Sequence, residues 1–287
     1  MPKTLPLVCP ACHNSVVLQS TGQPFLNCGS PGCDSRYPIV GGVPILIQNW
    51  VDYARSERWI ILRRHDLHPE IDALLDEPLG DEQPERIRRK NLATYMRSHF
   101  GEAPEELADL SRMLPQWVRE WLPASAQVGL DAGCATGGFT AMLAERVHQA
   151  AGIDLHFERV HAAAQRVHNA TFLVASAEEP PFKLESIGVI LALNLIDSVF
   201  HPRLTLENLR DCLEPGGLLL LTTPFEYTTI NAPRSEWLDG QALHAMLAAD
   251  FDILDDRERL PWILPASDRH ADIFFVRAIA ARKRSTS

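Results

Sequence analysis

The sequence predicts an α/β protein, with a parallel β-sheet covered by helices on both faces and a small separate unit at the N-terminus. From residue 127 onward, short apolar runs alternate with segments of helical spacing, an alternation typical of βαβ units. A turn of small residues follows the first apolar run at 132–138, where a strand would lead into a helix N-terminus. Four cysteines in the first 33 residues predict the separate unit.

Length and charge limit the functions that the chain can have. Its 287 residues leave room for one large domain and one small one. The formal net charge of −10 argues against general binding to a phosphate backbone. No apolar run is long enough to span a bilayer, and no apolar segment follows Met1 as in a signal peptide. We therefore expect a soluble cytoplasmic protein with reduced thiols.

The N-terminal cysteines form two pairs, Cys9 with Cys12 and Cys28 with Cys33. Two short cysteine turns at this separation are typical of a tetrahedral Zn²⁺ site with four thiolate ligands. Such a site is closed to water, so we expect a structural metal rather than a catalytic one. Two disulfides are the alternative.

A segment that follows these cysteines, Arg36-Tyr-Pro-Ile-Val-Gly-Gly-Val-Pro-Ile-Leu-Ile47, resembles the end of the Trm112-like zinc ribbon family. The resemblance implies a ribbon domain over residues 1–49. Members of that family partner methyltransferases, either as separate chains or as fused domains. The resemblance therefore also implies a protein partner that binds through the ribbon.

Residues 50–123 lack the alternation of strands and show helical apolar spacing instead. We expect a helical connector between the ribbon and the main domain, 124–287. Tyr95, His99 and Phe100 stand shortly before that domain. They either line its cleft as a lid or belong to the core.

The main domain divides into strands and helices in a regular order. Ligands of such sheets bind beside the carboxyl ends of the strands. We expect strands at 128–131, 150–154, 170–176, 187–193 and 218–223, helices at 138–148, 156–169 and 204–213, and two final strands at 251–255 and 272–280.

The turn after the first strand carries a recognisable pattern. Asp131 stands two residues before Gly133, and Ala135 and Gly137 follow. The small side chains let backbone N–H groups approach a ligand. The pattern resembles motif I of the class I S-adenosylmethionine (SAM) methyltransferases, with Ala135 in the place of a glycine. The resemblance implies a Rossmann-like sheet of seven strands whose last strand is antiparallel, with SAM as the cofactor.

Two further segments extend this resemblance. Asp154 ends the second strand, where family members hold the ribose hydroxyls with an acidic residue, and a carboxylate can accept both O–H groups. Residues 175–182 resemble the segment beside the adenine, with Ser176 in the place of the usual Asp. The resemblance implies cofactor contacts from Asp131, Gly133, Cys134, Ala135, Gly137, Asp154, Leu155, Ser176, Ala177, Glu178 and Asn194. For Cys134, a buried apolar role is the alternative to a thiolate role.

The residues that handle the methyl acceptor should follow the fourth and fifth strands. Asn194-Leu-Ile-Asp197 and the segment around Tyr227 resemble the branch of mercaptohistidine and carnosine N-methyltransferases. Asp197 would accept a hydrogen bond from one imidazole nitrogen, so that the other nitrogen presents its lone pair. A helix N-cap is the alternative role for Asp197. We expect Asn194, Asp197 and Tyr227 to be catalytic, with Trp237, Trp262, Arg269 and His270 as further candidates.

These patterns favour methyl transfer from SAM to a small molecule, through an imidazole or amine nitrogen. Two alternatives remain open from the sequence. One is an rRNA or tRNA base methyltransferase with an N-terminal zinc ribbon. The other is a non-catalytic scaffold that holds a partner through the ribbon.

Overall fold

The computed structural model describes residues 5–16, 24–56, 68, 70–71, 85–101, 103–229, 231–267 and 269–285. Of residues 55–56 and 85–91, it describes the backbone only.

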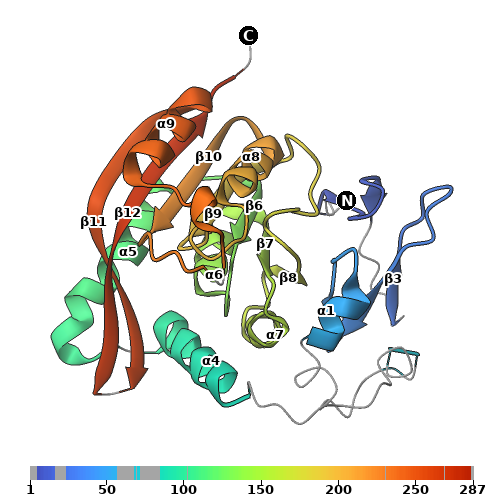
Figure 1. Ribbon diagram of the computed structural model, residues 1–287, viewed down its shortest axis with the longest axis horizontal. Helices are drawn as coiled ribbons and strands as arrows, with labels where there is room; N and C mark the ends of the chain where they lie inside the picture. Colours follow the sequence, from blue (N-terminus) through green and yellow to red (C-terminus); the bar gives the residue numbers. More distant parts are fainter. Residues whose placement is uncertain are drawn as a thin grey trace.

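A seven-stranded sheet forms the centre of the molecule (Figure 1). Its strand order is β11-β12-β10-β9-β6-β7-β8, and β12 alone runs antiparallel to its neighbours. The expected α/β fold is therefore confirmed. The strands are β6 (Ala126–Ala132), β7 (Val147–Asp154), β8 (Thr171–Val174), β9 (Ile187–Leu193), β10 (Leu213–Thr223), β11 (Phe251–Ser267) and β12 (His270–Lys283).

Helices cover the sheet, and several of them bury apolar side chains against it. Within the described residues, no helix is both long and apolar enough to cross a membrane. The α-helices are α1 (Trp50–Ser56), α4 (Glu85–Phe100), α5 (Ala108–Trp121), α6 (Gly138–Ala144), α7 (Phe157–Arg166), α8 (Pro202–Cys212) and α9 (Gly240–Asp250).

The buried side chains of β10 divide between two hydrophobic clusters. Leu219 and Leu221 belong to the cluster that includes residues of α7, α8 and α9, whereas Leu218 and Leu220 belong to the cluster that includes residues of α5. This division follows from the period of two along a strand. The near-continuous leucine run therefore fills two cores at once, as expected for a strand buried on both faces.

The hairpin of β11 and β12 is longer than the predicted strands at 251–255 and 272–280. It extends beyond the sheet to reach α4 and α5 (Figure 1). Ser98 of α4 donates to the carbonyl of Ile263 at 3.3 Å, and the indole of Trp117 in α5 donates to Asp255 at 2.8 Å. The hairpin thereby joins the connector helices to the main domain.

The N-terminal unit comprises two small sheets, with the strands β1 (Leu7–Val8), β2 (Ser15–Val16), β3 (Phe25–Asn27), β4 (Arg36–Val40) and β5 (Val43–Pro44). It lies at the β8 end of the central sheet (Figure 1). Ile45 pairs with Val174 of β8, and the amide of Leu46 donates to the Val174 carbonyl at 2.8 Å. The unit and the main domain share one hydrophobic core, so the edge of the sheet is covered by the chain's own N-terminus.

Candidate functional site

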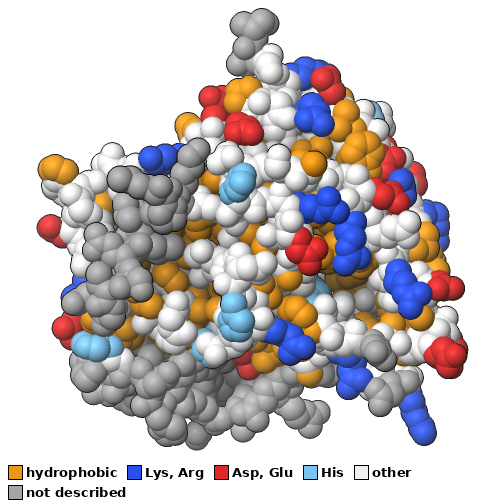
Figure 2. Space-filling model, turned by 180° about the vertical axis from the view of Figure 1, so that it is seen from behind, with side chains coloured by type: hydrophobic (Ala, Val, Ile, Leu, Met, Phe, Trp, Pro, Cys, Tyr) orange, Lys and Arg blue, Asp and Glu red, His pale blue; other side chains and the backbone are white. Residues whose placement is uncertain are grey.

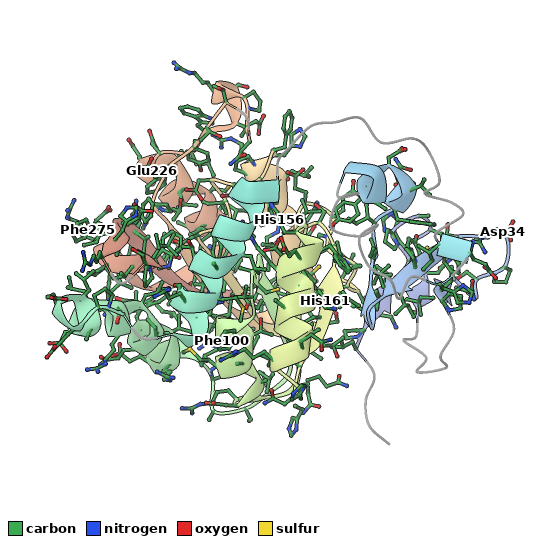
Figure 3. The ribbon with its side chains drawn as sticks, turned by 90° about the horizontal axis from the view of Figure 1, so that it is seen from below. Asp34, Phe100, His156, His161, Glu226 and Phe275 are labelled. Atoms are coloured by element: carbon green, nitrogen blue, oxygen red, sulfur yellow. The ribbon has the colours of Figure 1, made fainter. Side chains whose placement is uncertain are left out.

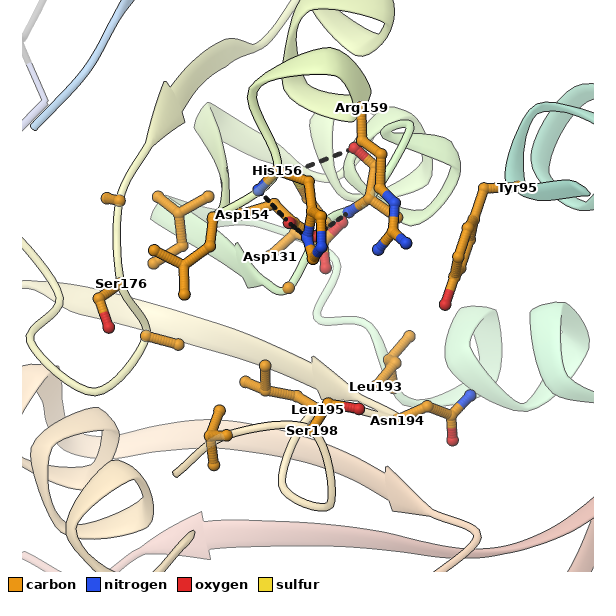
Figure 4. A pocket seen from close by; sticks show the side chains of 18 of the residues that line it. Tyr95, Asp131, Asp154, His156, Arg159, Ser176, Leu193, Asn194, Leu195 and Ser198 are labelled. Carbon is orange, nitrogen blue, oxygen red and sulfur yellow. Dashed lines mark hydrogen bonds and ion pairs between the residues drawn. The ribbon is translucent and has the colours of Figure 1, made fainter. Parts of the chain in front are cut away.

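A cavity of about 380 Å³ lies at the carboxyl ends of β6, β7 and β9 (Figure 4). This is the edge at which ligands of such sheets bind. Ten of the eleven residues expected to contact the cofactor line it, and Gly137 does not. The ten are Asp131, Gly133, Cys134, Ala135, Asp154, Leu155, Ser176, Ala177, Glu178 and Asn194.

The small-residue turn between β6 and α6 adopts a backbone that few residues tolerate. Gly133, Ala135 and Gly137 have φ values of 80°, 46° and 83°. A Cβ at Gly137 would also lie 2.9 Å from the ring of Phe172. Glycine is therefore required at 137 by both conformation and space.

The backbone amides of this turn do not point freely into the cavity, contrary to the expectation from the sequence. The Ala135 N–H donates to Asp154 Oδ2 at 3.0 Å, and the Gly137 N–H donates to a carbonyl within the turn. The Gly138 N–H, at the start of α6, donates to His99 Nδ1 at 3.0 Å. The turn thus uses these donors to hold its own shape, and side chains supply more of the polar lining.

Asp154 is held as a charged acceptor at the end of β7. Its Oδ1 accepts from the His156 N–H at 2.8 Å and lies 3.0 Å from His156 Nδ1. Burial alone would raise the pKa of Asp154, but the bonds from His156 and the charge of Arg159 hold that pKa below its usual value. An ionised carboxylate of this kind suits a pair of ribose hydroxyls.

Asp131 is more deeply buried, with 2% of its surface exposed. Its Oδ2 accepts from the Thr140 hydroxyl at 2.6 Å, which ties β6 to α6. Burial raises the pKa of Asp131 to about 7 despite this bond. Burial also raises the pKa of the neighbouring Cys134 thiol, so the thiol is neutral and the apolar role of Cys134 is favoured.

Ser176 lies at one end of the cavity, opposite Tyr95 and Asn194 (Figure 4). Its hydroxyl accepts from the Glu178 N–H at 3.1 Å. The Glu178 carboxylate accepts the amides of Phe200 and His201, which precede α8. Because the Glu178 side chain is occupied in this way, the contacts available to a ligand at this end come from Ser176 and the nearby backbone.

Helix α4 supplies a wall of the cavity through Tyr95 and His99. It lies beside α7, and Figure 3 shows Phe100 at its end. Phe100 does not line the cavity. Its ring lies 4.5 Å from the guanidinium of Arg166 in α7 and packs against the core. Of the two roles considered for these aromatic residues, Tyr95 and His99 therefore line the cleft, whereas Phe100 packs outside it.

His99 Nδ1 is an acceptor, since it receives the Gly138 N–H and lies 2.8 Å from the Thr136 hydroxyl. Its proton must then sit on Nε2. Burial, together with the charge of Arg159, lowers the pKa of His99 to about 4. The imidazole is therefore neutral near pH 7 and serves as a cap for the first turn of α6.

Of the three residues expected to be catalytic, only Asn194 lines the cavity. It has a φ of 53°, and its side-chain oxygen accepts from the Thr222 hydroxyl at 2.8 Å. Trp262, from the β11–β12 hairpin, also lines the cavity. Asp197 and Tyr227 do not line it.

Asp197 joins two loops instead. It is 4% exposed, and its Oδ2 accepts from the Glu226 N–H at 3.0 Å, which links the loop after β9 to the loop after β10. Burial raises the pKa of Asp197. The N-cap alternative is wrong, because α8 begins at Pro202 and its N-cap is His201. Within the described structure, Asp197 Oδ1 has no hydrogen-bond partner.

The other acceptor candidates lie away from the cavity lining. Tyr227 stacks on Trp237 with ring centroids 5.7 Å apart, and burial raises the pKa of Tyr227 to about 12. Arg269 and His270 stand at the turn of the β11–β12 hairpin, and the exposed His270 Nε2 lies 3.4 Å from Asp272 Oδ1. None of these four residues lines the cavity with Asn194.

Several residues that line the cavity were not predicted from the sequence; these are His156, Arg159, Phe139, Ser198, Val199, Phe200 and Asn231. Arg159 is five residues after Asp154, on the first turn of α7. The only signal for it in the sequence is this short separation from an acidic residue at a strand end.

The four N-terminal cysteines gather in one place. Their Sγ atoms all lie within 4.8 Å of one another, with 3.5 Å between Cys12 and Cys28 and 3.9 Å between Cys9 and Cys33. A tetrahedral Zn²⁺ with bonds of about 2.3 Å places its thiolates about 3.8 Å apart, so the four residues fit the metal. All four are free thiols, and these separations do not suit the disulfide alternative.

Comparison with known proteins agrees with the fold and the cavity. Residues 130–221 match the family model described as "Methyltransferase domain". No curated protein matches the chain. The match covers the turn, Asp154 and Asn194, and thus most of the cavity.

Solved structures with a similar fold have low identity to the chain. The YcgJ protein of Bacillus subtilis is 18% identical, with 61% of this chain and 99% of that chain covered and a TM-score of 0.46. The N-methyltransferase NodS of Bradyrhizobium japonicum WM9, with S-adenosyl-L-homocysteine bound, is 17% identical (68% and 100% covered, TM-score 0.48). A chain from the complex of the Haloferax volcanii Trm112 activator and a methyltransferase is 15% identical (72% of this chain and 100% of that chain covered, TM-score 0.49).

The sheet order, the small-residue turn and the family match together define a class I methyltransferase domain. The part of the chain that matches the family model, residues 130–221, is thus a methyltransferase domain.

Proposed function

We propose that the protein transfers the methyl group of SAM to an imidazole or amine nitrogen of a small molecule. The observation that carries the proposal is the aromatic part of the cavity lining. Tyr95, Phe139 and Trp262 line the cavity from three separate elements, and Asn194 lines the same cavity. Pockets of this kind, mostly apolar with a few polar groups, suit small molecules.

Methyl transfer from a sulfonium is an in-line displacement, in which the acceptor's lone pair attacks the methyl carbon while the sulfur leaves. The protein must align the two reactants and exclude water. SAM supplies the activated methyl group. Asp154 would hold its ribose, and Ser176 would lie at its adenine end.

Asn194 is suited to contact the acceptor. Its side-chain oxygen is fixed by Thr222, and its amide nitrogen has no recorded partner among the described residues. We assign Asp197 to positioning, since its carboxylate holds the loop of Glu226 beside the strand end that carries Asn194. Asp197 Oδ1 has no hydrogen-bond partner in the described structure, but it is buried. It could therefore contact the acceptor only if the loop of Glu226 moved.

We also propose that the N-terminal unit is a Trm112-like ribbon with a structural zinc ion held by Cys9, Cys12, Cys28 and Cys33. The geometry of the four thiols supports this assignment. The ribbon packs on its own methyltransferase domain, and its inferred role is to stabilise that domain. A contact with another protein stays a prediction.

Charge argues against the nucleic-acid alternative. The net charge is −10, and on the face in Figure 2 basic side chains are interspersed with acidic ones rather than gathered in a continuous basic stripe. A base methyltransferase would be retained on RNA at moderate salt, and we expect this protein to elute. The scaffold alternative predicts no binding of SAM in calorimetry.

The direct test is formation of S-adenosylhomocysteine with a panel of imidazoles, amines and thiols. We expect turnover with at least one imidazole or amine, and a loss of most of it in Asn194→Ala. Arg282→Ala, at an exposed position near the end of β12, is the control and should keep the activity. Turnover confined to RNA or to thiols would overturn the proposal.

A further inference from the structure

Arg159 occupies an unusual place in the cavity. Its guanidinium lies 4.4 Å from the centre of the Tyr95 ring. Figure 4 shows it between Asp154 and Tyr95, on the side of the cavity away from Ser176. Among the described residues that line the cavity, it is the only Lys or Arg side chain.

The cavity otherwise offers little to an anion. The amides of Ala135, Gly137 and Gly138 are bonded within the protein, so these three donors are not free to bind an anion, as amides at such a place often do. Asp131 and Asp154 line the same cavity. A carboxylate that enters it needs a cation, because an unpaired buried charge costs several kcal/mol or more.

The guanidinium is available for that purpose. Asp154 is engaged by the amides of Ala135 and His156, and in the described structure no ion pair is recorded for Arg159. Stacking on Tyr95 uses the face of the guanidinium and leaves its N–H edge free. That edge is the part of the group that binds a carboxylate through two parallel hydrogen bonds.

We propose that Arg159 binds a carboxylate in this cavity. SAM has one at its amino-acid end, and an amino-acid-like acceptor would have another. The position beyond Asp154 and away from Ser176 is where the amino-acid end of the donor would lie if Asp154 holds the ribose. The inference rests on the use of SAM and does not depend on which acceptor is methylated.

Calorimetry with two nucleosides tests whether Arg159 binds the carboxylate of the methyl donor. S-adenosylhomocysteine carries the amino-acid end, whereas 5′-methylthioadenosine lacks it. In Arg159→Gln, we expect the affinity for S-adenosylhomocysteine to fall roughly ten- to a hundredfold, and that for 5′-methylthioadenosine to stay unchanged. Arg159→Lys should recover part of the loss. Arg166→Gln is the matched control, because Arg166 lies on the same helix and stacks on Phe100 outside the cavity.

A second experiment tests whether Arg159 binds the carboxylate of the methyl acceptor instead of that of SAM. Histidine and histamine differ in one carboxylate, and each is titrated into protein saturated with S-adenosylhomocysteine. If Arg159→Gln leaves the nucleosides unaffected and weakens histidine relative to histamine, Arg159 binds the acceptor's carboxylate. The proposal would be overturned if Arg159→Gln lowered the affinity for both nucleosides equally. It would also be overturned if the substitution changed neither the affinity for the nucleosides nor that for histidine relative to histamine. Thermal melting of each variant excludes misfolding as the cause.

Discussion

At the scale of single residues, the site depends on polar side chains that hold both the protein and the ligand. Asp154 accepts the amides of Ala135 and His156 and is still open to the cavity. A carboxylate has about four acceptor positions, so it can fix the turn and bind a ribose at once. Its lowered pKa keeps it ionised for both tasks.

Replacing Asp154 should therefore weaken the binding of SAM by more than the loss of a single hydrogen bond would. Asp154→Ala removes the acceptor of two hydroxyls and leaves the Ala135 amide without a partner. We expect a loss of about 1–3 kcal/mol in binding free energy, measured by calorimetry with S-adenosylhomocysteine. Asp252→Ala, which breaks an exposed ion pair with Arg284, is the control. An unchanged affinity would contradict the assignment of Asp154 to the ribose.

His99 makes the stability of the protein sensitive to acid. Its pKa is about 4 in the folded protein and about 6.5 in an unfolded chain. As the pH falls from 6.5 towards 4, the unfolded chain gains a proton that the folded protein does not take up, so stability is lost over this range. Asn in place of His99 keeps an acceptor for Gly138 without titrating.

In His99→Asn, we expect a smaller loss of stability between pH 7.5 and pH 5 than in the native protein, by about 2 kcal/mol. Urea unfolding at the two pH values measures this difference. His244→Asn, at an exposed ion pair with Asp256, controls for the removal of an imidazole. Parallel losses in the native protein and His99→Asn would show that His99 does not cause the acid sensitivity.

Sequence patterns could reveal Asp154 and could not reveal His99 or Arg159. Asp154 ends an apolar run, and its neighbours in the sequence are also its neighbours in the site. His99 reaches Gly138 across 39 residues, through the packing of α4 on α6. No local pattern records that contact. Asp197 is the reverse case, because its place after a strand suggested the site whereas its carboxylate accepts from the Glu226 N–H and does not line the cavity.

At the scale of elements, α1 and α7 meet at the loop that follows Asp154. The Tyr53 hydroxyl in α1 donates to the Leu155 carbonyl and accepts the Phe157 N–H at 3.1 Å, at the first residue of α7. One hydroxyl thus satisfies a donor at the start of a helix and an acceptor in the loop. A helix outside the main domain thereby fixes the loop that follows Asp154, the carboxylate proposed to hold the ribose.

Tyr53→Phe should loosen this loop without unfolding the protein. We expect the affinity for S-adenosylhomocysteine to fall about two- to tenfold, which corresponds to one or two net hydrogen bonds. The melting temperature should change by no more than a few degrees. Calorimetry and a thermal melt on the same sample separate the two effects. If the affinity stays the same, Tyr53 has no influence on the loop.

The β11–β12 hairpin shows where the prediction of elements failed. Residues 255–259 are all charged, which hides the alternation expected of a strand. In the structure, Arg277 on β12 pairs with Asp256, and Arg257 pairs with Asp255 and with Glu120 of α5, so ion pairs across strands, within β11 and to a helix accommodate this run. The parallel strands were predictable because each is a continuous apolar run, whereas the hairpin depends on its partners.

At the scale of the whole molecule, the N-terminal unit and the methyltransferase domain form one folded body. Leu7 and Ile45 are buried in the same cluster as Phe172 and Val174. The sequence predicted each unit separately, from the cysteines and from the βαβ order. Their joining at β8 was not predictable, because an edge strand has free backbone groups along its whole length and the sequence does not say what pairs with them.

This joining predicts that loss of the metal proposed for the N-terminal unit also weakens ligand binding in the distant cavity. An N-terminal unit of about 45 residues has too small a core to fold without the proposed metal. Its unfolding would expose the β8 edge and the apolar residues that Ile45 covers, and Tyr53 would lose its fixed place beside Leu155.

We expect about one zinc per chain by elemental analysis, and a lower melting temperature and weaker binding of S-adenosylhomocysteine after chelation. Cys12→Ser should reproduce both effects. Added zinc should reverse them in the native protein alone, whereas an unchanged melting temperature and affinity in the chelated protein would show that the two units fold independently.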